Sequence, residues 1–450
     1  MKNTSPLGAP ASSPALGKQP TRTSALPVLT PKLRFPEFRQ AKGWTEKPLH
    51  EVAQINSGND GLPESFVYID LESVEAGKLR AKTRILRNGA PSRAQRLLKR
   101  GDIIYQIVRP YQRNNWFCEF DDDDTYVAST GYAQLRAKGS NHFLYQSVHA
   151  DPFVERVIAK CTGSNYPAIN SSDLAQIELP LPPTLPEEEK IAECLSTLDE
   201  LIGAESQKLD ALKAHKKGLM QQLFPREGET LPRLRFPEFR DAPDWELSSI
   251  QNLIEEGLII GHLDGNHGEL YPRAEDFSSS GVPYITANDF ADGLVDFARC
   301  RHLPEARASK FRKGVAKDGD ILFAHNATVG PVAKLSTSLN FVILSTTATY
   351  FRCDLSRLDN DFLKCALTSP AFVNQYSRVM AQSTRNQVPI TAQRKFFLQA
   401  PSVAEQLHIA SCFSLLDDLS VAQHEKLEAL KTHKRGLMQQ LFPAMEAVSA

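Results

Sequence analysis

An internal duplication constrains the fold of this chain more than any other feature of its 450 residues. The opening motif, LRFPEFR at residues 33–39, recurs at residues 234–240, an offset of 201 (234 − 33). The closing motif, HKKGLMQQLFP at residues 215–225, recurs with one change at residues 433–443, an offset of 218 (433 − 215). Because self-similarity at a long period marks repeated structural units, the sequence predicts two copies of one unit.

The second copy is 17 residues longer than the first (218 − 201), and this extra length can be placed. A tryptophan follows each opening motif at the same distance, Trp44 and Trp245. The segment KRGDII at residues 99–104 already matches KDGDIL at residues 317–322 with the offset of 218, so the insertion lies between Trp245 and Lys317. Elsewhere between the shared ends the copies diverge strongly. Each unit therefore consists of a variable globular domain followed by a constant helix.

The constant segments carry a heptad pattern. Steps of four and three residues starting at Ile191 and at Ile409 meet eight and seven apolar residues out of ten, respectively. This pattern predicts an a/d seam on two long helices. The residues predicted to form the seam are, among these apolar positions, Ile191, Leu195, Leu198, Ile202, Leu209, Leu212 and Leu219 in the first helix and Ile409, Leu416, Leu427, Leu430 and Leu437 in the second.

A helix over residues 187–224 would be roughly 57 Å long, and a seam of that length needs a partner. The nearest partner is the second copy of the helix. Heptads alone do not fix whether the pair is parallel or antiparallel; antiparallel pairing would relate the two domains by a pseudo-twofold axis. The alternative is that each helix packs only on its own domain.

The variable domains alternate short apolar runs with turn residues, which predicts strands at residues 66–69, 102–105, 282–285 and 320–323. Helical patterns cover residues 143–160 and 361–380. The fold class is therefore α+β: two mixed α/β domains in tandem, each followed by a long helix. The predicted boundaries are a disordered leader at 1–30, a first domain at 31–183, a first helix at 184–225, a second domain at 226–403, a second helix at 404–443 and a tail at 444–450.

The net charge of −1 gives no global indication of a nucleic-acid ligand, so any such surface must be local. Between Arg80 and Arg113 ten basic residues accompany one acidic residue, a local charge of +9 (10 − 1). Between Arg299 and Lys334 eight basic and three acidic residues give +5 (8 − 3). Because the two stretches occupy overlapping positions in the two copies, they are candidates for phosphate and base contacts. The alternative is a solvated basic face neutralised by acidic neighbours such as residues 121–124.

Polar clusters at residues 164–166, 266–267, 288–289 and 384–387 could reach base edges, although each is equally consistent with turn chemistry. The predicted DNA-contact residues are Arg80, Lys82, Arg84, Arg87, Arg93, Arg96, Arg109, Arg113, Asn165, Asn266, His267, Lys310, Arg312, Lys313, Asn326, Arg385, Asn386 and Gln387.

The sequence lacks the common catalytic and nucleotide-binding motifs. It contains no GxxxxGK[ST], no GxGxxG after a strand, no Asn-Pro-Pro-aromatic motif and no HExxH. The seven cysteines are scattered without CxxC spacing, which indicates reduced thiols in a cytosolic protein. His262 and His267 lie in a Gly-rich stretch that favours a loop over a metal site. No apolar run approaches the ~20 residues of a membrane span. The sequence therefore predicts no catalytic residue, no metal and no cofactor of its own.

The duplicated motifs give the chain a family resemblance. The opening motif followed by Trp, the Gly-Asp-Ile segments at 101–103 and 319–321, the Pro-rich ends of both domains and the paired Gly-Leu-Met-Gln-Gln-Leu-Phe helix ends resemble the specificity subunit of type I restriction–modification enzymes. The segment DGNHG at residues 264–268 is similar to a recurrent second-domain pattern of that family. The resemblance covers about residues 31–443.

The resemblance implies a non-catalytic subunit with two target-recognition domains, each reading one half of a split double-stranded DNA site. It implies two long antiparallel helices that set the gap between the half-sites and dock two methyltransferase subunits. Restriction and translocase subunits would join them in the prokaryotic cytoplasm. S-adenosylmethionine, ATP and Mg²⁺ would be bound by those partners, which methylate adenine or cleave DNA. Since the two domains differ, we expect an asymmetric site. The competing hypothesis is a protein-interaction scaffold that does not contact DNA.

Overall fold

The computed structural model describes residues 29–58, 61–383 and 385–443, so the predicted leader and tail lie almost entirely outside the described residues. The chain forms two compact units. The first unit comprises Met1–Ile202 with Ala429–Ala450, and the second unit comprises Gly203–Glu428. The division does not separate the two sequence copies, because it passes through both long helices. Each unit therefore contains one variable domain, the first part of the helix that follows it and the last part of the other helix.

The domain of the first unit is built on two four-stranded sheets, with the strand orders β6-β3-β10-β7 and β2-β11-β8-β9. A strand pair, β1 with β12, joins the beginning of the domain to its end. The strands are β1 Thr45–Pro48, β2 Ala53–Ile55, β3 Ser65–Ile69, β4 Val74–Glu75, β5 Lys78–Leu79, β6 Thr83–Leu86, β7 Ala94–Leu97, β8 Ile103–Gln106, β9 Trp116–Phe117, β10 Tyr126–Ser129, β11 Tyr132–Ala137 and β12 Glu178–Leu181. The helices are α1 Leu49–Val52, α2 Asn141–His149, α3 Asp151–Ala159 and α4 Ser171–Ala175.

The Gly-Asp-Ile segment begins the central strand β8, whose alternate side chains enter two cores. Ile103 and Tyr105 pack with residues of α2 and α3, whereas Ile104 packs with Trp116 and Tyr126 on the other face. This alternation follows from the two-residue period of a strand. The strand is apolar on both faces because both are buried.

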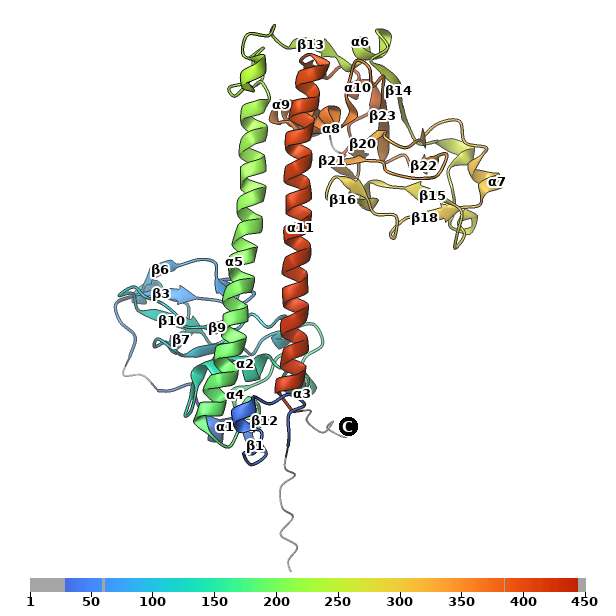
Figure 1. Cartoon of the computed structure of the whole chain (residues 1–450). Helices are drawn as coiled ribbons and strands as arrows, with labels where there is room; N and C mark the ends of the chain where they lie inside the picture. The colour runs from blue at the N-terminus through green and yellow to red at the C-terminus, as the bar shows by residue number, and fades with distance from the viewer. Residues whose placement is uncertain (1–28, 59–60, 384, 444–450) are drawn as a thin grey trace, which may run out of the picture. The chain divides into compact units, whose positions relative to one another are not determined.

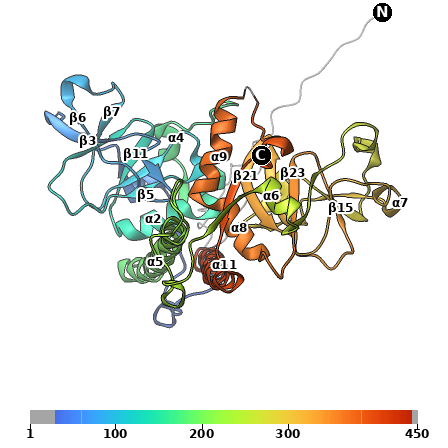
Figure 2. The ribbon, with the colours of Figure 1, turned by 90° about the horizontal axis from the view of Figure 1, so that it is seen from above.

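The domain of the second unit has a six-stranded sheet, β14-β23-β20-β21-β17-β16, and a four-stranded sheet, β18-β15-β22-β19, with β13 paired to β24. Helix α8 packs on strands β20 and β21 of the larger sheet; Figure 2 shows α8 and β21 from above. The strands are β13 Glu246–Ser249, β14 Ile259–Asp264, β15 Val282–Ile285, β16 Phe290–Ala291, β17 Leu294–Val295, β18 Arg301–Leu303, β19 Val315–Ala316, β20 Ile321–Asn326, β21 Thr328–Lys334, β22 Val342–Leu344, β23 Ala348–Cys353 and β24 Phe397–Ala400. The helices are α6 Ile250–Glu255, α7 Glu305–Ala308, α8 Asn360–Thr368, α9 Pro370–Ala381 and α10 Ile390–Gln393.

Each of the two helices predicted inside the domains is in fact a pair of helices. Residues 143–160 contain α2 and α3, which are separated at Ala150, and residues 361–380 contain α8 and α9, which are separated at Ser369. Both separating residues have an extended backbone, with ψ of 136° and 150°, and a proline stands in the first turn of the following helix. Because proline lacks an N–H and clashes with the preceding turn, it starts a new helix here.

The constant segments form two helices of 39 residues each, α5 Leu185–Leu223 and α11 Val403–Leu441 (Figure 1). Every predicted seam residue is buried or half-buried. In the first unit Ile191 and Leu195 of α5 join a core that contains Leu441 of α11. In the second unit Leu223 of α5 joins a core that contains Ile409 of α11. The seam therefore packs against the other helix and against a domain at once. Over the described residues no helix is both long and apolar enough to cross a bilayer.

Candidate nucleic-acid interface

A buried ion pair explains why the opening motif is repeated. Arg34 donates from Nε and Nη2 to the Glu187 carboxylate at 2.7 Å each, and Trp44 Nε1 donates to the same carboxylate at 3.1 Å. The remaining Arg34 donors reach the carbonyls of Ala41 and Lys42, both at 2.9 Å. The side chains of Arg34 and Glu187 are only 8% and 1% exposed. A buried charge needs such complete pairing to be tolerated.

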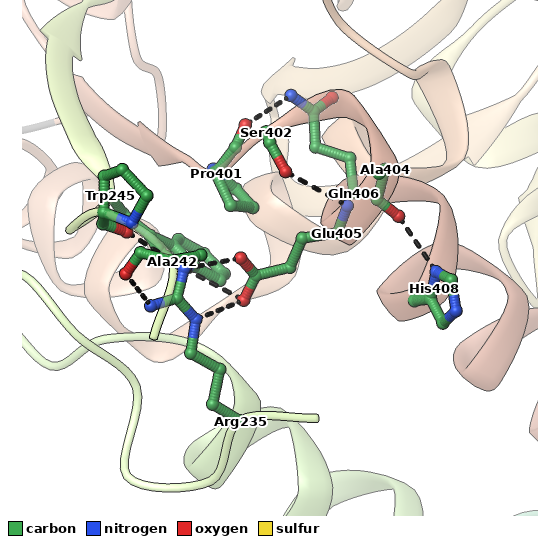
Figure 3. Close-up of polar contacts among 10 residues, drawn as sticks. Arg235, Ala242, Trp245, Pro401, Ser402, Ala404, Glu405, Gln406 and His408 are labelled. Atoms are coloured by element: carbon green, nitrogen blue, oxygen red, sulfur yellow. Dashed lines mark hydrogen bonds and ion pairs between the residues drawn. The ribbon is translucent and has the colours of Figure 1, made fainter. Parts of the chain in front are cut away.

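The second unit contains the same arrangement, drawn in Figure 3. Arg235 contacts Glu405 at 2.8 and 2.7 Å, and Trp245 Nε1 lies 3.4 Å from it. Arg235 also donates to the carbonyls of Ala242 and Pro243. The glutamates, here called the anchor glutamates, were missed by our sequence analysis, although their offset of 218 (405 − 187) matches that of the helices. The anchor is structural and fixes each domain to the start of its helix.

The opening motif also holds the end of the other helix. Leu33 N–H donates to the Gln440 carbonyl at 2.9 Å in the first unit, and Leu234 N–H donates to the Gln222 carbonyl at 2.9 Å in the second. These contacts satisfy carbonyls that would otherwise be orphaned in the last helical turn. The opening and closing motifs are therefore constant because they bind each other.

The two domains share a second backbone arrangement at one end of their central strands. In the first domain Ile169 N–H donates to the Ile107 carbonyl at 3.0 Å, and Arg109 N–H donates to the Pro167 carbonyl at 2.7 Å. In the second domain the corresponding bonds run from Val388 to His325 at 2.7 Å and from Ala327 to Asn386 at 2.9 Å. We call these two places the strand-end sites. Each brings together a strand end and a loop that are far apart in the sequence.

Both strand-end sites contain a non-glycine residue in the left-handed region, Arg109 with φ of 55° and Ala327 with φ of 64°. In the first domain Arg113, with φ of 54°, ends the same turn, residues 109–113. Such a conformation costs roughly 1–2 kcal/mol per residue, and residues held in it cluster at functional sites. The equivalence of Arg109 and Ala327 follows from the offset of 218 that relates the Gly-Asp-Ile segments (327 − 109).

The first strand-end site opens into a pocket of about 850 Å³. The Arg109 guanidinium lies 4.4 Å from the centre of the Tyr166 ring, a cation–π contact. Buried Gln106 forms the floor: its Nε2 donates to Gln112 Oε1 at 2.9 Å, and its Oε1 accepts from Asn114 N–H at 3.1 Å. The pocket is lined by Leu71, Glu72, Val74, Glu75, Arg93, Gln106, Val108, Arg109, Gln112, Asn114, Thr130, Gly131 and Tyr166.

The second strand-end site opens into a smaller pocket of about 320 Å³. Asn326 and Ala327 line it together with Asn288, Arg299 and Arg301. The Arg301 guanidinium lies 3.9 Å from the centre of the Phe277 ring. The two pockets thus occupy equivalent ends of equivalent strands but present different side chains.

Several predicted DNA-contact residues of the first basic stretch have acidic partners. Arg80 pairs with Glu75 at 3.1 Å, Lys82 with Asp122 at 2.7 Å and Arg84 with Asp124. The hydrogen bond from Lys82 lowers the pKa of Asp122, and that carboxylate in turn raises the pKa of Lys82. For these three residues the alternative of a neutralised basic face therefore fits the contacts.

The remaining residues of this stretch differ from one another. Arg113 pairs with Asp151 at 2.7 Å and also donates to the His149 carbonyl, and Arg87 donates to the Leu62 carbonyl. Burial lowers the pKa of Arg96, whose Nε has no partner among the described residues. Arg93 and Arg109 line the pocket, and Asn165 is exposed next to Tyr166.

In the second domain Asn266 has an internal role, because its buried side chain donates to the Lys313 carbonyl at 2.7 Å. His267 is exposed and lies 3.3 Å from Asp264. Asn326, Asn386 and Gln387 meet at the strand-end site. Lys310, Arg312, Lys313 and Arg385 are exposed. Within residues 29–58, 61–383 and 385–443 no cluster of three potential metal ligands occurs.

Residues 41–214 match the family model described as Type I restriction modification DNA specificity domain. Over these residues the chain is similar to type I DNA specificity domains. Among the relatives of the chain is the Type I restriction enzyme MjaVIII specificity subunit of Methanocaldococcus jannaschii, 24% identical over 285 residues. That match covers 62% of this chain and 64% of the relative, so the chain spans just under two thirds of the relative's length.

Two solved structures have a fold similar to that of this chain. The S subunit of a type I restriction–modification system from M. genitalium has a TM-score of 0.57 at 15% identity, over 93% of this chain and all of that one (100%). A chain solved in work on complex assembly and conformational transition of the type I R-M system has a TM-score of 0.53 at 21% identity, over 89% and 98%. At these identities the likeness concerns the fold.

Proposed function

We propose that this chain is the DNA-specificity subunit of a type I restriction–modification complex. Each variable domain reads one half of a split DNA site, and partner subunits then methylate adenine or cleave DNA. The observation that carries this proposal is the pair of strand-end sites, in which one backbone arrangement presents two different sets of side chains. Two different sets of side chains imply two different half-sites and hence an asymmetric target.

We further propose that α5 and α11 form an antiparallel coiled coil with pseudo-twofold symmetry. Within the second unit Lys216 pairs with Asp417, whereas Glu205, earlier on α5, accepts a hydrogen bond from Gln423, later on α11. Within the first unit Lys434 pairs with Asp199 at 2.6 Å. Both members of the two ion pairs are related by the offset of 218 (434 − 216 and 417 − 199). These reciprocal contacts are what such symmetry requires.

The constant helices provide constant surfaces for partners. In this proposal they dock two methyltransferase subunits, and restriction and translocase subunits join the complex in a prokaryotic cytoplasm. The chain itself catalyses nothing: S-adenosylmethionine, ATP and Mg²⁺ are bound by the partners. In the alternative scaffold function the two variable domains would bind other proteins, and the strand-end sites would not contact DNA.

A map of N6-methyladenine across the host genome, with and without this gene, tests the proposal. We expect methylation at one split, asymmetric motif to disappear when the gene is deleted. If the host shows no difference, the chain is co-expressed with its neighbouring methyltransferase and given S-adenosylmethionine and unmethylated genomic DNA. Absence of any methylated motif in that reconstitution would contradict the proposal and favour the scaffold.

A further inference from the structure

Arg109 differs from the other arginines of its stretch in what its side chain contacts. Over the part of the chain that the structure describes, its guanidinium has no carboxylate or carbonyl partner and is held only by the Tyr166 ring at 4.4 Å. Arg84 and Arg113, in contrast, are each paired with an aspartate. Arg109 is therefore held in place while its N–H donors stay available to a ligand.

Both members of the Arg109–Tyr166 pair are fixed by the backbone. Arg109 N–H donates to the carbonyl of Pro167, the residue that follows Tyr166, and Val108 pairs with Ala168 in the same short ladder. Arg109 is further confined by its left-handed conformation. Tyr166 is 64% exposed, so the pair stands at the surface of the pocket. A side chain placed in this way loses little conformational freedom when it binds a ligand.

The charges around Arg109 favour a base over a phosphate. Glu72 and Glu75 line the same pocket as Arg93 and Arg109; Glu75 is paired with Arg80, and the Glu72 carboxylate remains to weaken the attraction of these arginines for the DNA backbone. The major-groove edge of a guanine–cytosine pair, in contrast, offers two acceptors on guanine and an amino donor on cytosine. The arginine fork matches the guanine acceptors in a bidentate contact, and a glutamate can accept from the cytosine amino group.

We propose that Arg109, positioned by Tyr166, is a specificity-determining residue that reads a guanine in the half-site of the first domain. This inference rests on the proposed function and deepens it. The second domain cannot read its half-site in this way, because the equivalent positions are Ala327 and Arg385. The side chain of Ala327 has no hydrogen-bond donor. The arginine of the second domain, Arg385, stands instead at the position of Tyr166.

The test uses the full-length chain in complex with its methyltransferase subunits and a library of randomised duplex DNA, from which bound molecules are selected and sequenced. We expect the wild-type complex to select a split sequence with a guanine–cytosine pair in one half. Arg109→Ala should reduce the preference at that pair by roughly 5- to 150-fold and leave every position of the other half unchanged. The half-site that changes is thereby assigned to the first domain.

Matched variants separate base reading from other roles. Tyr166→Phe keeps the ring and should keep the preference, whereas Tyr166→Ala should weaken it at the same base pair. Arg84→Ala, an exposed arginine of the same stretch, should leave all base preferences unchanged. Unfolding temperatures equal to wild type would show that the Arg109→Ala chain is folded; if that variant fails to fold, Arg109→Lys takes its place.

Three results would overturn the inference while the proposed function stands: Arg109→Ala changes no position, it weakens all sequences equally as loss of a phosphate contact would, or the affected pair lacks guanine. A wild-type complex that selects no sequence would instead overturn the proposed function, and this inference with it.

Discussion

The anchors and the strand-end sites are both present twice, yet only the anchors have kept their side chains. Each anchor uses Arg, Trp and Glu with nearly the same hydrogen bonds, and its ion pair is almost fully buried. At the strand-end sites the backbone bonds are kept, but Arg109 and Tyr166 of one domain correspond to Ala327 and Arg385 of the other. A side chain is held constant where its partner lies inside the protein, and the proposed function explains why it is free to change where its partner would be DNA.

The interiors of the two domains have also diverged. Ile103 begins the central strand of the first domain, and Ile321 begins that of the second. Two strand pairings away from Ile103 lies Ile55, and two strand pairings away from Ile321 lies His262, so His262 occupies the position of Ile55. His262 is 4% exposed, and its Nδ1 has no partner among the described residues. Its Nε2 lies 3.2 Å from Gln393 Oε1. The second domain therefore carries a buried titratable group where the first carries an aliphatic one.

The largest effect is expected at the anchors. Glu405→Ala leaves the Arg235 guanidinium buried without a counterion, which should lower the free energy of unfolding by about 3–5 kcal/mol. Unfolding in urea is followed by hydrogen exchange, and the exchange rate of each peptide should show that this loss of stability lies in the second unit. Glu187→Ala should give a loss of similar size in the first unit. Glu425→Ala, an exposed residue of the same helix as Glu405, is the control. A loss below about 1 kcal/mol for both anchor variants would contradict the claim that the buried ion pairs stabilise the two units.

The second expected effect is an unequal response of the two domains to acid. In the second domain burial lowers the pKa of His262 to about 4 from an ordinary value of 6.5 and also lowers the pKa of His325, whereas in the first domain it lowers that of His149 to about 4. As the pH falls from 6.5 to 4, the unfolded chain protonates histidines that the folded chain does not, so His262 and His149 should each cost their domain about 3 kcal/mol of stability, and His325 adds to the loss in the second domain. Denaturation of wild type at pH 7 and pH 4, resolved by hydrogen exchange on β20, measures this loss.

His262→Gln should remove that part of the pH dependence, even though the variant is less stable at pH 7. His424→Gln, at an exposed position of α11, should leave the dependence unchanged. Equal pH dependence in wild type and His262→Gln would show that the buried histidine is protonated without cost.

The smallest effect is expected where the two units are most alike. Lys216→Ala and Lys434→Ala each remove one partly exposed ion pair between α5 and α11, and each should cost about 0.5–1 kcal/mol. Because the two pairs are equivalent, the two losses should agree within about 0.5 kcal/mol. Denaturation midpoints of the two variants measure them, and a strongly unequal result would show that the helix contacts differ between the units.

The sequence predicted the long helices well because their signal is repeated along many turns. Every predicted seam residue, from Ile191 to Leu437, is buried or half-buried. It predicted the short domain helices less well, because the apolar period continues across Pro152 and Pro370 while the backbone does not. In these short segments the prediction followed the hydrophobic pattern and overlooked the single proline that decides where the second helix starts.

The candidate site was predicted only in part. A run of basic residues does not show which of them have acidic partners. Lys82 and Arg84 meet aspartates 40 positions away in the sequence, whereas Arg109 meets a tyrosine. The sequence did predict polar clusters at residues 164–166 and 384–387, each of which contains at least one residue of a strand-end site. It did not reveal the role of the anchor glutamates, since a glutamate near a helix start is commonplace in sequence and its burial is visible only in three dimensions.

The contact between Leu33 and Gln440 has a consequence for how the chain is made. During synthesis the first variable domain leaves the ribosome well before α11, yet one of its hydrophobic clusters contains Leu441 and Phe442. The other hydrophobic clusters of this domain consist of residues 49–181 and can form as those residues emerge, N-terminal part first. Ile191 and Leu195 of α5 then pack with Trp44 and Phe143. The part of that cluster that Leu441 and Phe442 complete must stay open until the end of α11 has been made.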